Sequence, residues 1–296
     1  MKDVTLRFYK QQMLRVLVHI QQHLDEALEL ETLARLASLS PSHFHHVFSG
    51  MLGESLAAHI RRLRLERAAS RLKLTRHSII DIALEAGYEA HEAFTRAFRN
   101  SFGSSPTEYR TVKRRLVQID VPSGVHFGGN GALSRFRVGA VAPIQVKVIR
   151  LPPKRVAFMR HTGPYHRVGR TWEKLMLFVG REGLLAGNPE FIGICHDDPA
   201  VTAPKRIRYD ACITVDERFK PRGDIGAQVI AGGDYAMTTH FGPYEKLGRS
   251  YAKLLGQWLP RSGRTLRFEP CFEVYLNSPE NTEPRGLLTD IYAPLQ

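Results

Sequence analysis

The segments HTGPYHRVGRTWEKLMLFV, residues 161–179, and HFGPYEKLGRSYAKLLGQW, residues 240–258, repeat one pattern 79 residues apart. Both place His, Gly, Pro and Tyr at the same offsets, then Gly-Arg, and then an aromatic residue, Trp172 in one and Tyr251 in the other. Self-similarity at a fixed spacing sets the architecture of a chain, and two copies are too few for a solenoid. The repeat therefore predicts a pseudo-symmetric pair of units with a groove between them.

The sequence around these segments predicts strands on both sides of a helix. Residues 144–151, 155–161, 190–197 and 207–215 alternate apolar and polar side chains around the first copy, as do 229–241, 271–277 and 287–295 around the second. The copies themselves have the spacing of amphipathic helices, expected over residues 165–181 and over 244–259, ending at Pro260. We expect residues 144–296 to form an α+β domain of two strand-helix-strand-strand repeats, at about 144–220 and 227–296.

Residues 1–115 have helical periodicity and contain a second internal echo. TLARLASLSPSHFHHVFSGMLG, from Thr32, and DIALEAGYEAHEAFTRAFRNSFG, from Asp81, each predict a short helix, a turn and a second helix. Residues 55–74 between them are strongly helix-forming, and about 20 residues at a rise of ~1.5 Å span about 30 Å. This is close to the ~34 Å of one duplex turn, so the two second helices are spaced to enter successive major grooves. The expected fold is α+β multidomain: an all-α tandem helix-turn-helix domain followed by the α+β domain.

The second helix of each helix-turn-helix has one apolar and one polar face. The residues with the spacing of a core-facing stripe are Phe44, Val47, Phe48, Phe94, Ala97 and Phe98. The opposite faces carry hydrogen-bonding side chains of the kind that read base edges in a major groove. The candidate DNA-binding residues are Ser42, His45, His46, Ser49, His91, Glu92, Thr95, Arg96 and Arg99.

The composition favours a polyanionic partner. The chain has 42 basic and 29 acidic residues, a net charge of +13 and a pI of about 9.9. Such an excess favours nucleic acid, here double-stranded DNA, over a membrane. The sequence has no run of 18 apolar residues and no signal-peptide core, so we expect a cytoplasmic protein.

The cysteines and histidines form no familiar metal or disulfide motif. Cys195, Cys212 and Cys271 contain no CxxC pair, and Cys195 and Cys212 lie on consecutive expected strands. Two alternatives stay open for Cys195 and Cys212: a redox-active pair, or isolated buried thiols. The histidines cluster at His43, His45 and His46. Metal ligands on a helix favour i, i+4 spacing, whereas the side chains of the adjacent His45 and His46 diverge. No metal is therefore expected. No cofactor is expected either.

Residues 116–143 are rich in Gly and small residues and have weak periodicity, which predicts an interdomain linker.

Residues 10–110 resemble the DNA-binding domain of AraC/XylS-family transcription regulators, particularly the Rob-like branch. SIIDIALEAGYEAHEAFTRAFRNSFGSSPTEYR, from Ser78, follows that family's diagnostic pattern from I-x-D-I-A to G-x-[ST]-P-x-x-[YF]-R. The resemblance implies sequence-specific DNA binding and transcription control, with RNA polymerase as a further candidate partner. Ser38 stands where the family usually has Gly, which is expected to strain that turn.

Residues 144–296 resemble the GyrI-like effector-binding domain through HTGPY, HFGPY, DDPAVTAPKRIRYDACITV and CFEVYLN. The resemblance implies a groove that binds small, often cationic or aromatic molecules, as in multidrug sensors. Alternation places Cys271, Glu273 and Tyr275 on one face of a strand, and the position equivalent to Glu273 in the first copy is Gly193. A buried carboxyl needs a partner, which is either a cationic ligand or an arginine of the chain. The candidate effector-binding residues are Glu273, Tyr275, Tyr165, Trp172, Trp258 and Tyr292.

These features predict a ligand-responsive, sequence-specific DNA-binding transcription regulator whose C-terminal groove senses a small-molecule effector, and not an enzyme. Two alternatives stay open. Some GyrI-like proteins are hydrolases of electrophilic small molecules, and Glu273 with Tyr275 is available here as a base and its assistant. The second alternative is a module that binds another protein, as the gyrase-inhibitor relatives do.

Overall fold

The computed structural model describes residues 2–112, 119–129, 133, 135–138, 143–199 and 202–296. The chain divides into two compact units, residues 6–140 and residues 141–296 with the first five residues. Residues 113–118, which include the predicted end of the first domain, and residues 200–201 of the DDPAVTAPKR motif lie outside the described residues. Within the described ranges, no helix is both long enough and apolar enough to span a bilayer.

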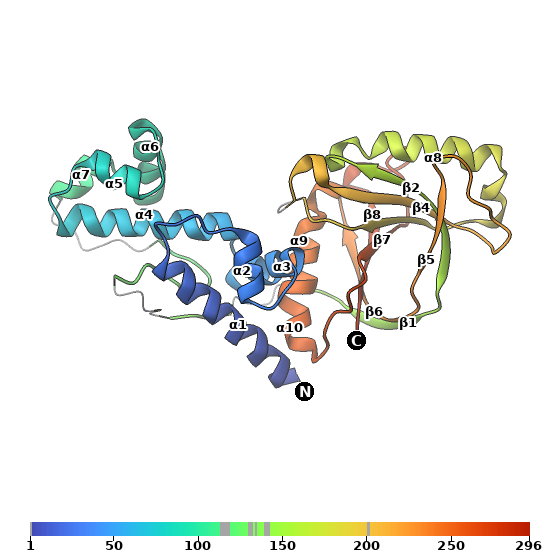
Figure 1. Cartoon of the computed structure of the whole chain (residues 1–296), viewed down its shortest axis with the longest axis horizontal. Helices are drawn as coiled ribbons and strands as arrows, with labels where there is room; N and C mark the ends of the chain where they lie inside the picture. Colours follow the sequence, from blue (N-terminus) through green and yellow to red (C-terminus); the bar gives the residue numbers. More distant parts are fainter. Residues whose placement is uncertain (1, 113–118, 130–132, 134, 139–142, 200–201) are drawn as a thin grey trace. The chain divides into compact units, whose positions relative to one another are not determined.

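Two helix-turn-helix pairs form the N-terminal unit, as the sequence predicts. After α1 (Lys2–Gln22), the first pair is α2 (Leu30–Leu36) and α3 (Pro41–Leu52), and the second pair is α5 (Ile79–Glu85) and α6 (His91–Phe102). α4 (Leu56–Leu74) joins the pairs, and α7 (Pro106–Thr111) follows them. Figure 1 shows α2 and α3 near one end of α4 and α5–α7 at the other. The 19 residues of α4 span about 28 Å at a rise of ~1.5 Å, close to the expected spacing.

Local hydrogen bonds and backbone angles define these pairs. Ser40 Oγ accepts a hydrogen bond from the backbone N–H of His43, and Ser78 Oγ accepts one from that of Asp81, so both serines cap helices. The turn inside the second pair uses Gly87 at φ 83°, and the turn inside the first uses Ser38 at φ 56°. The left-handed region costs an L-residue about 1–2 kcal/mol and glycine little, so the turn at Ser38 is strained, as expected.

The apolar stripes of α3 and α6 face the core. Phe44, Val47, Phe48, Phe94 and Phe98 are fully buried, and Ala97 is half-buried. Apolar residues of α4, among them Leu65, Ala68 and Leu72, pack in one cluster with the aromatic residues of α6. α4 is therefore both the spacer between the pairs and a wall of the second pair's core.

Residues 121–129 require a correction to the linker interpretation. Val125 is fully buried in the structure. Gln21 of α1 donates to the carbonyl oxygen of His126 at 2.8 Å, and Glu66 of α4 accepts from the N–H of Phe127 at 2.8 Å. Glu66 also lies 3.1 Å from His126 Nδ1. The small residues that resemble a linker let the backbone itself lie against α1 and α4, so the segment is a strap on the N-terminal unit.

One eight-stranded sheet forms the C-terminal unit. Its strands are β1 (Lys147–Leu151), β2 (Lys154–Thr162), β3 (Phe191–Cys195), β4 (Arg208–Thr214), β5 (Gly226–Ile230), β6 (Gly233–Phe241), β7 (Cys271–Tyr275) and β8 (Leu288–Pro294). The order across the sheet is β1-β6-β8-β7-β3-β4-β2-β5, with every neighbouring pair antiparallel. The expected strands are confirmed, and residues 229–241 form a pair, the end of β5 and β6. Figure 1 shows that the sheet is strongly curled.

The repeated segments are helical, but the second differs from its expected form. The first copy is η1 (Tyr165–Arg167) and α8 (Gly169–Arg181); the second is η4 (Tyr244–Lys246), α9 (Leu247–Tyr251), the π-helix η5 (Ala252–Trp258) and α10 (Leu259–Ser262). The expected end at Pro260 is wrong, because Pro260 lies in the first turn of α10. Pro260 has no N–H to donate to the preceding turn, and that turn is the wider π-helix η5, which runs directly into α10. The shorter elements are η2 (Leu184–Gly187), η3 (Pro204–Arg206) and η6 (Pro284–Gly286).

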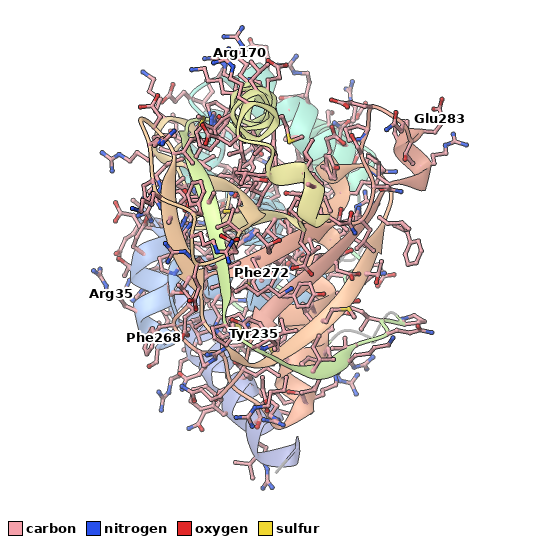
Figure 2. The ribbon with its side chains drawn as sticks, turned by 90° about the vertical axis from the view of Figure 1, so that its right-hand side faces the viewer. Arg35, Arg170, Tyr235, Phe268, Phe272 and Glu283 are labelled. Carbon is pink, nitrogen blue, oxygen red and sulfur yellow. The ribbon has the colours of Figure 1, made fainter. Side chains whose placement is uncertain are left out.

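The two faces of the sheet have different neighbours. One face carries an apolar cluster that includes Phe272, Val274 and Tyr235, and Figure 2 shows Tyr235 near Phe272, with ring centroids 5.3 Å apart. On the other face, α8 packs on β2 and β4, with Leu175 buried against the odd-numbered residues of β4. Glu273 lies between Phe272 and Val274 in the sequence, so alternation directs it to the face that the helices cover.

Candidate effector site and nucleic-acid interface

Glu273 lies at the centre of β7 and only 4% of it is exposed. The hydroxyl of Tyr275 donates to Glu273 Oε2 at 2.8 Å, and that of Tyr251 on α9 donates to Oε1 at 3.1 Å. The thiol of Cys195 on β3 donates to the same Oε1 at 3.5 Å. Side chains from two strands and a helix thus converge on one buried carboxyl.

A chain of hydrogen bonds leads to Glu273 from α8. Trp172 Nε1 donates to the hydroxyl of Tyr209 at 3.1 Å, and the hydroxyls of Tyr209 and Tyr275 lie 2.9 Å apart. Tyr275 already donates its proton to Glu273, so Tyr209 must be the donor between the two tyrosines. The chain therefore runs from Trp172 through Tyr209 and Tyr275 to Glu273, with every proton directed toward the carboxyl.

The carboxyl of Glu273 has no cationic neighbour among the described residues; its hydrogen-bond donors are the two tyrosines and the cysteine. Burial raises the pKa of Glu273, and the hydrogen bonds offset only part of that rise. Asp210 on β4 is also fully buried but differs in its partners. Arg160 donates to both oxygens of Asp210, at 2.7 and 2.8 Å, and although burial opposes it, these bonds lower the pKa of Asp210. Glu273 is therefore the buried acid whose charge the described chain leaves uncompensated.

Most of the expected effector residues lie around Glu273. Tyr165 packs edge-on against the ring of Tyr209, with centroids 5.7 Å apart, and Trp172 packs edge-on against Tyr275 at 5.8 Å. The hydroxyl of Tyr165 donates to the carbonyl oxygen of Asp197 at 3.0 Å, which fixes its ring. Together with Glu273, the expected residues Tyr165, Trp172 and Tyr275 form one aromatic cluster.

Two of the expected effector residues lie elsewhere. Tyr292 stacks on Phe272, with centroids 4.6 Å apart and planes 6° from parallel, on the opposite face of the sheet. Placing Tyr292 in this site was therefore wrong, because the face of a strand residue follows from register with β7, which the sequence does not reveal. Trp258 lies on η5, and among the described residues the hydrogen-bond donors to Glu273 are Tyr251, Tyr275 and Cys195, not Trp258.

Sequence reasoning missed several aromatic residues of the cluster. Tyr209 and Tyr251 make the hydrogen bonds described above, and Tyr244 packs edge-on against Tyr275 at 5.4 Å. The repeat contained the signal for two of them, because Tyr251 is equivalent to Trp172 and Tyr244 is the tyrosine of the second GPY. No comparable signal marked Tyr209.

The outer face of α6 is open to solvent, as a DNA-reading helix requires. Residues His91, Glu92, Arg96 and Arg99 are exposed and Thr95 is half-buried. Phe94 and Phe98 hold the opposite face in the core. The helix therefore presents donors and acceptors along one accessible side, which is the arrangement that direct readout in a major groove needs.

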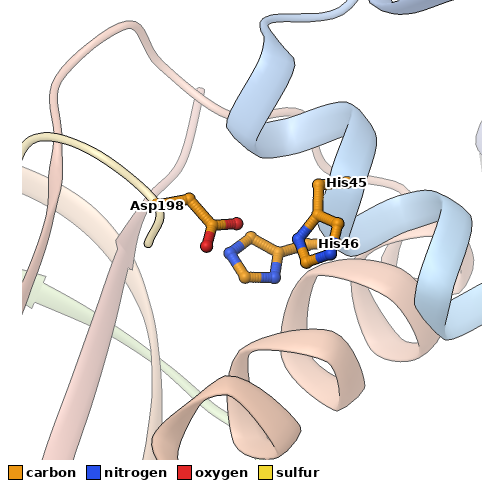
Figure 3. A group of neighbouring side chains, drawn as sticks. All are labelled: His45, His46 and Asp198. Atoms are coloured by element: carbon orange, nitrogen blue, oxygen red, sulfur yellow. The ribbon is translucent and has the colours of Figure 1, made fainter. Parts of the chain in front are cut away.

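The outer face of α3 is less open. Ser42, His45 and Ser49 are half-buried, and His46 is 8% exposed. Figure 3 shows the neighbouring rings of His45 and His46, with centroids 5.4 Å apart and planes tilted by 55°. His43 packs against Tyr9 of α1 at 5.8 Å, and burial lowers the pKa of His43 to about 4. α1 therefore lies against α3 at His43.

Comparisons with known proteins match both halves of the chain. Residues 144–296 match the family described as a GyrI-like small molecule binding domain, and residues 33–111 match a helix-turn-helix domain. The probable transcriptional regulator YgiV of Escherichia coli strain K12 is 30% identical over 154 residues, which cover 51% of this chain and 96% of YgiV.

Two other relatives match through the helix-turn-helix half. The HTH-type transcriptional regulator YbfP of Bacillus subtilis strain 168 is 39% identical over 110 residues, 37% of each chain. The right origin-binding protein of Escherichia coli strain K12 is 37% identical over 95 residues, which cover 32% of this chain and 33% of that protein. The matches thus span only about a third of the length of these two relatives.

Proposed function

We propose that this chain, which belongs to the family with a GyrI-like small molecule binding domain and carries an AraC-type helix-turn-helix domain, is a ligand-responsive transcription regulator. The observation that carries the proposal is Glu273, a buried carboxyl with a raised pKa and no cationic neighbour among the described residues. It lies in the small-molecule domain of a chain whose other domain has two helix-turn-helix pairs. Double-stranded DNA, a small effector and RNA polymerase are the proposed partners, and the cytoplasm is the proposed location.

The effector class that suits Glu273 is a cation with an aromatic or apolar body. A buried carboxylate without a compensating charge costs several kcal/mol, which a bound cation would offset. The rings of Trp172 and Tyr165 beside it would add a cation–π attraction of roughly 0.5–2 kcal/mol. Three donors already surround the carboxyl oxygens, so a cation has to reach Glu273 between the Tyr251, Tyr275 and Cys195 side chains. Size and shape would therefore matter as well as charge.

We further propose that the sensing domain consists of two pseudo-symmetric repeats. Outward from the β7–β3 pair, the sheet continues as β8, β6 and β1 on one side and as β4, β2 and β5 on the other. Each strand on one side has its sequence equivalent at the same place on the other, 79 or 80 residues away, which supports a duplication. The two copies then supply two similar walls, and their difference at Gly193 and Glu273 makes the space between them chemically one-sided.

DNA reading is assigned to the outer faces of α3 and α6. The proposed contacts are Ser42, His45, Ser49, His91, Glu92, Thr95, Arg96 and Arg99, with His46 as a less exposed member. The length of α4 supports insertion of both helices into successive grooves on one side of the duplex.

The proposal is tested by binding of aromatic cations and of their neutral isosteres to the full chain and to Glu273→Gln, measured by titration calorimetry. Glu273→Gln keeps the shape and removes the charge, so cation affinity should fall by about 1.5–3 kcal/mol and neutral affinity by much less. The exposed Glu283→Gln is the control and should leave both unchanged. If Glu273→Gln unfolds the empty domain and leaves cation affinity intact, the carboxyl is structural and the sensing proposal fails.

One contact favours a second candidate function. The Tyr275 hydroxyl lies 2.8 Å from the Glu273 carboxyl, a pairing of a phenol with a base of raised pKa that suits hydrolysis of an electrophile. Incubation with epoxides and activated esters separates the two functions. Turnover that is lost in both Glu273→Gln and Tyr275→Phe identifies a hydrolase, and binding without turnover supports the sensor.

A further inference from the structure

Cys195 and Cys271 are direct partners in the register between β3 and β7. Direct partners on antiparallel strands point to the same face, with Cβ atoms about 4.5–5.5 Å apart. That face is the face of Glu273, which follows Cys271 by two residues, and Cys195 Sγ lies 3.5 Å from Glu273 Oε1. Both thiols are free and half-buried. Two thiols and a carboxyl therefore meet at one place in the sheet.

The structure pairs Cys195 with Cys271, whereas the sequence left open a pair of Cys195 and Cys212. Cys212 pairs with Ile192 in the register between β4 and β3, and it is fully buried in the apolar cluster of the opposite face. A bond between Cys195 and Cys212 would have to pass through the sheet. The open alternative of a redox pair on these two cysteines is therefore corrected, and Cys212 becomes a natural internal control.

The spacing of Cys195 and Cys271 suits a one-atom bridge better than a direct disulfide. Disulfides hold their Cβ atoms about 3.5–4.5 Å apart, which is shorter than the separation typical of a register pair. An atom bonded to both sulfurs adds the missing length. Burial also raises the pKa of both thiols, that of Cys271 to about 12, so they remain protonated and are poor attackers of disulfides or peroxides.

We propose that Cys195 and Cys271 form a dithiol site for trivalent arsenicals, a ligand class distinct from the cationic effector. In the reaction, an organoarsonous acid R–As(OH)₂ and two thiols give R–As(S–Cys)₂ and two molecules of water. Two As–S bonds form, two As–O bonds break, and each thiol proton leaves on a departing hydroxide, so no oxidant is consumed. The product needs no net release of protons to solvent, which suits thiols that stay protonated. Glu273 Oε1 already accepts the Cys195 S–H and can carry that proton to the leaving oxygen.

Occupancy of this site should be felt at Glu273. A bridged Cys195 no longer donates its S–H to the carboxyl, and the arsenic substituent fills space beside it. Bound arsenical and bound cation would then exclude each other. This consequence rests on the proposed function, whereas formation of the adduct does not.

The test uses the reduced full chain and phenylarsine oxide, followed by intact-mass spectrometry. We expect one adduct that survives a large excess of glutathione, a monothiol, and is removed by dimercaptopropanol, a dithiol. Cys195→Ser and Cys271→Ser should each lower the glutathione-resistant adduct at least tenfold, because a single thiol holds arsenic only reversibly. Cys212→Ser should retain it in full.

Retention of the resistant adduct in Cys195→Ser or Cys271→Ser, or its loss in Cys212→Ser, overturns the proposal. Cys195→Ala and Cys271→Ala are scored in the same way, and circular dichroism confirms that each variant is folded. If aromatic cations fail to bind but the adduct forms as described, only the effector proposal fails. If cations bind and no resistant adduct forms on the wild type, only the dithiol site fails.

Discussion

Gly193 lies directly opposite Glu273 in the register between β3 and β7, and it leaves the space that the tyrosine hydroxyls occupy. A Cβ built on Gly193 would lie 2.4 Å from the Tyr275 hydroxyl and 2.5 Å from that of Tyr209. The two positions are equivalent in the two copies of the repeat. Each copy therefore contributes a different feature to this cluster: one supplies the acid, and the other supplies the gap in which the tyrosine hydroxyls meet.

Gly193→Ala should disrupt the cluster around Glu273. Because the added methyl group overlaps both hydroxyls, Tyr209 and Tyr275 must shift, and we expect a loss of about 1–3 kcal/mol in the stability of the C-terminal unit. Both tryptophans, Trp172 and Trp258, lie in that unit, so urea unfolding followed by tryptophan fluorescence reports on it alone. Gly180→Ala on α8, where a Cβ meets nothing within 4 Å, is the control and should be neutral or slightly stabilising. Equal effects of the two substitutions would contradict this account.

The raised pKa of Glu273 predicts a specific pH dependence. Burial raises its folded pKa above its unfolded value, so its contribution to stability is full below the unfolded pKa and is lost as the pH rises through the folded pKa. Glu273→Gln lacks this loss. Urea unfolding should be measured from about pH 4 to about pH 8, which begins near the ordinary pKa of a glutamic acid and extends above it. As the pH increases, the free energy of unfolding of Glu273→Gln should rise relative to that of the wild type. A constant difference across the interval would mean that Glu273 does not titrate there.

The sequence predicted the helix-turn-helix pairs well because their signals are local. Serine caps, the glycine at 87 and aromatic spacing act within a few residues, so Ser40, Ser78 and Phe94 could be assigned without a structure. Residues whose role depends on the register between strands could not be assigned from the sequence. The face of Tyr292 and the partner of Cys195 follow from which strands lie side by side, and the order of the sheet is not written in any one strand.

The sequence did not predict the strap, residues 121–129, for a different reason. Glycine and small residues are typical of flexible linkers, but they also allow a backbone to lie directly on a helix. The contacts that hold residues 121–129 come from Gln21 and Glu66, which are about 60 to 105 residues away in sequence. Only a fold that brings α1, α4 and this segment together makes those contacts visible.

Ser38→Gly should stabilise the N-terminal unit. At φ 56° glycine avoids most of the left-handed penalty, and its extra freedom in the unfolded chain takes back part of the gain, leaving about 0.5–1 kcal/mol. Ala37→Gly next to it, at φ −80°, has no penalty to relieve and should destabilise. Hydrogen–deuterium exchange of peptides from α2 and α3 in the full chain measures both. If Ser38→Gly speeds exchange as Ala37→Gly does, the turn at Ser38 is not strained.

Glu66→Gln should loosen the strap. The carboxylate of Glu66 accepts from the N–H of Phe127 at 2.8 Å and from Arg62 at 2.9 Å, and hydrogen bonds to a charged group are each worth about 1.5–3 kcal/mol. We expect faster hydrogen–deuterium exchange over residues 121–129, by at least tenfold. Glu31→Gln on α2, an exposed acid, should leave that exchange unchanged. Unchanged protection in Glu66→Gln would show that the Gln21 hydrogen bonds and the burial of Val125 hold the segment without Glu66.

Arg96→Ala tests the assignment of α6 as a reading helix. The side chain is exposed on the outer face, where a bidentate contact to a guanine is the commonest use of arginine. If Arg96 reads a base, its removal should relax preference at one position of the half-site by about 1–3 kcal/mol and leave the other positions as they were. Affinities of the full chain for a selected duplex and its single-base substitutions, at one salt concentration, measure this. Arg35→Ala on α2 is the matched control, since it removes an exposed cation outside α6.

A phosphate contact at Arg96 would give a different pattern. Binding would weaken equally for every duplex, and the dependence of affinity on salt would become shallower by about one unit of the log–log slope, because one fewer counterion is released. His45→Ala on α3 provides the same comparison for the other half-site. If both helices of one chain read successive grooves, as the length of α4 suggests, the two variants should relax preference at positions about 10 base pairs apart. Positions that coincide, or a spacing far from one turn, would exclude simultaneous reading by both helices of one chain.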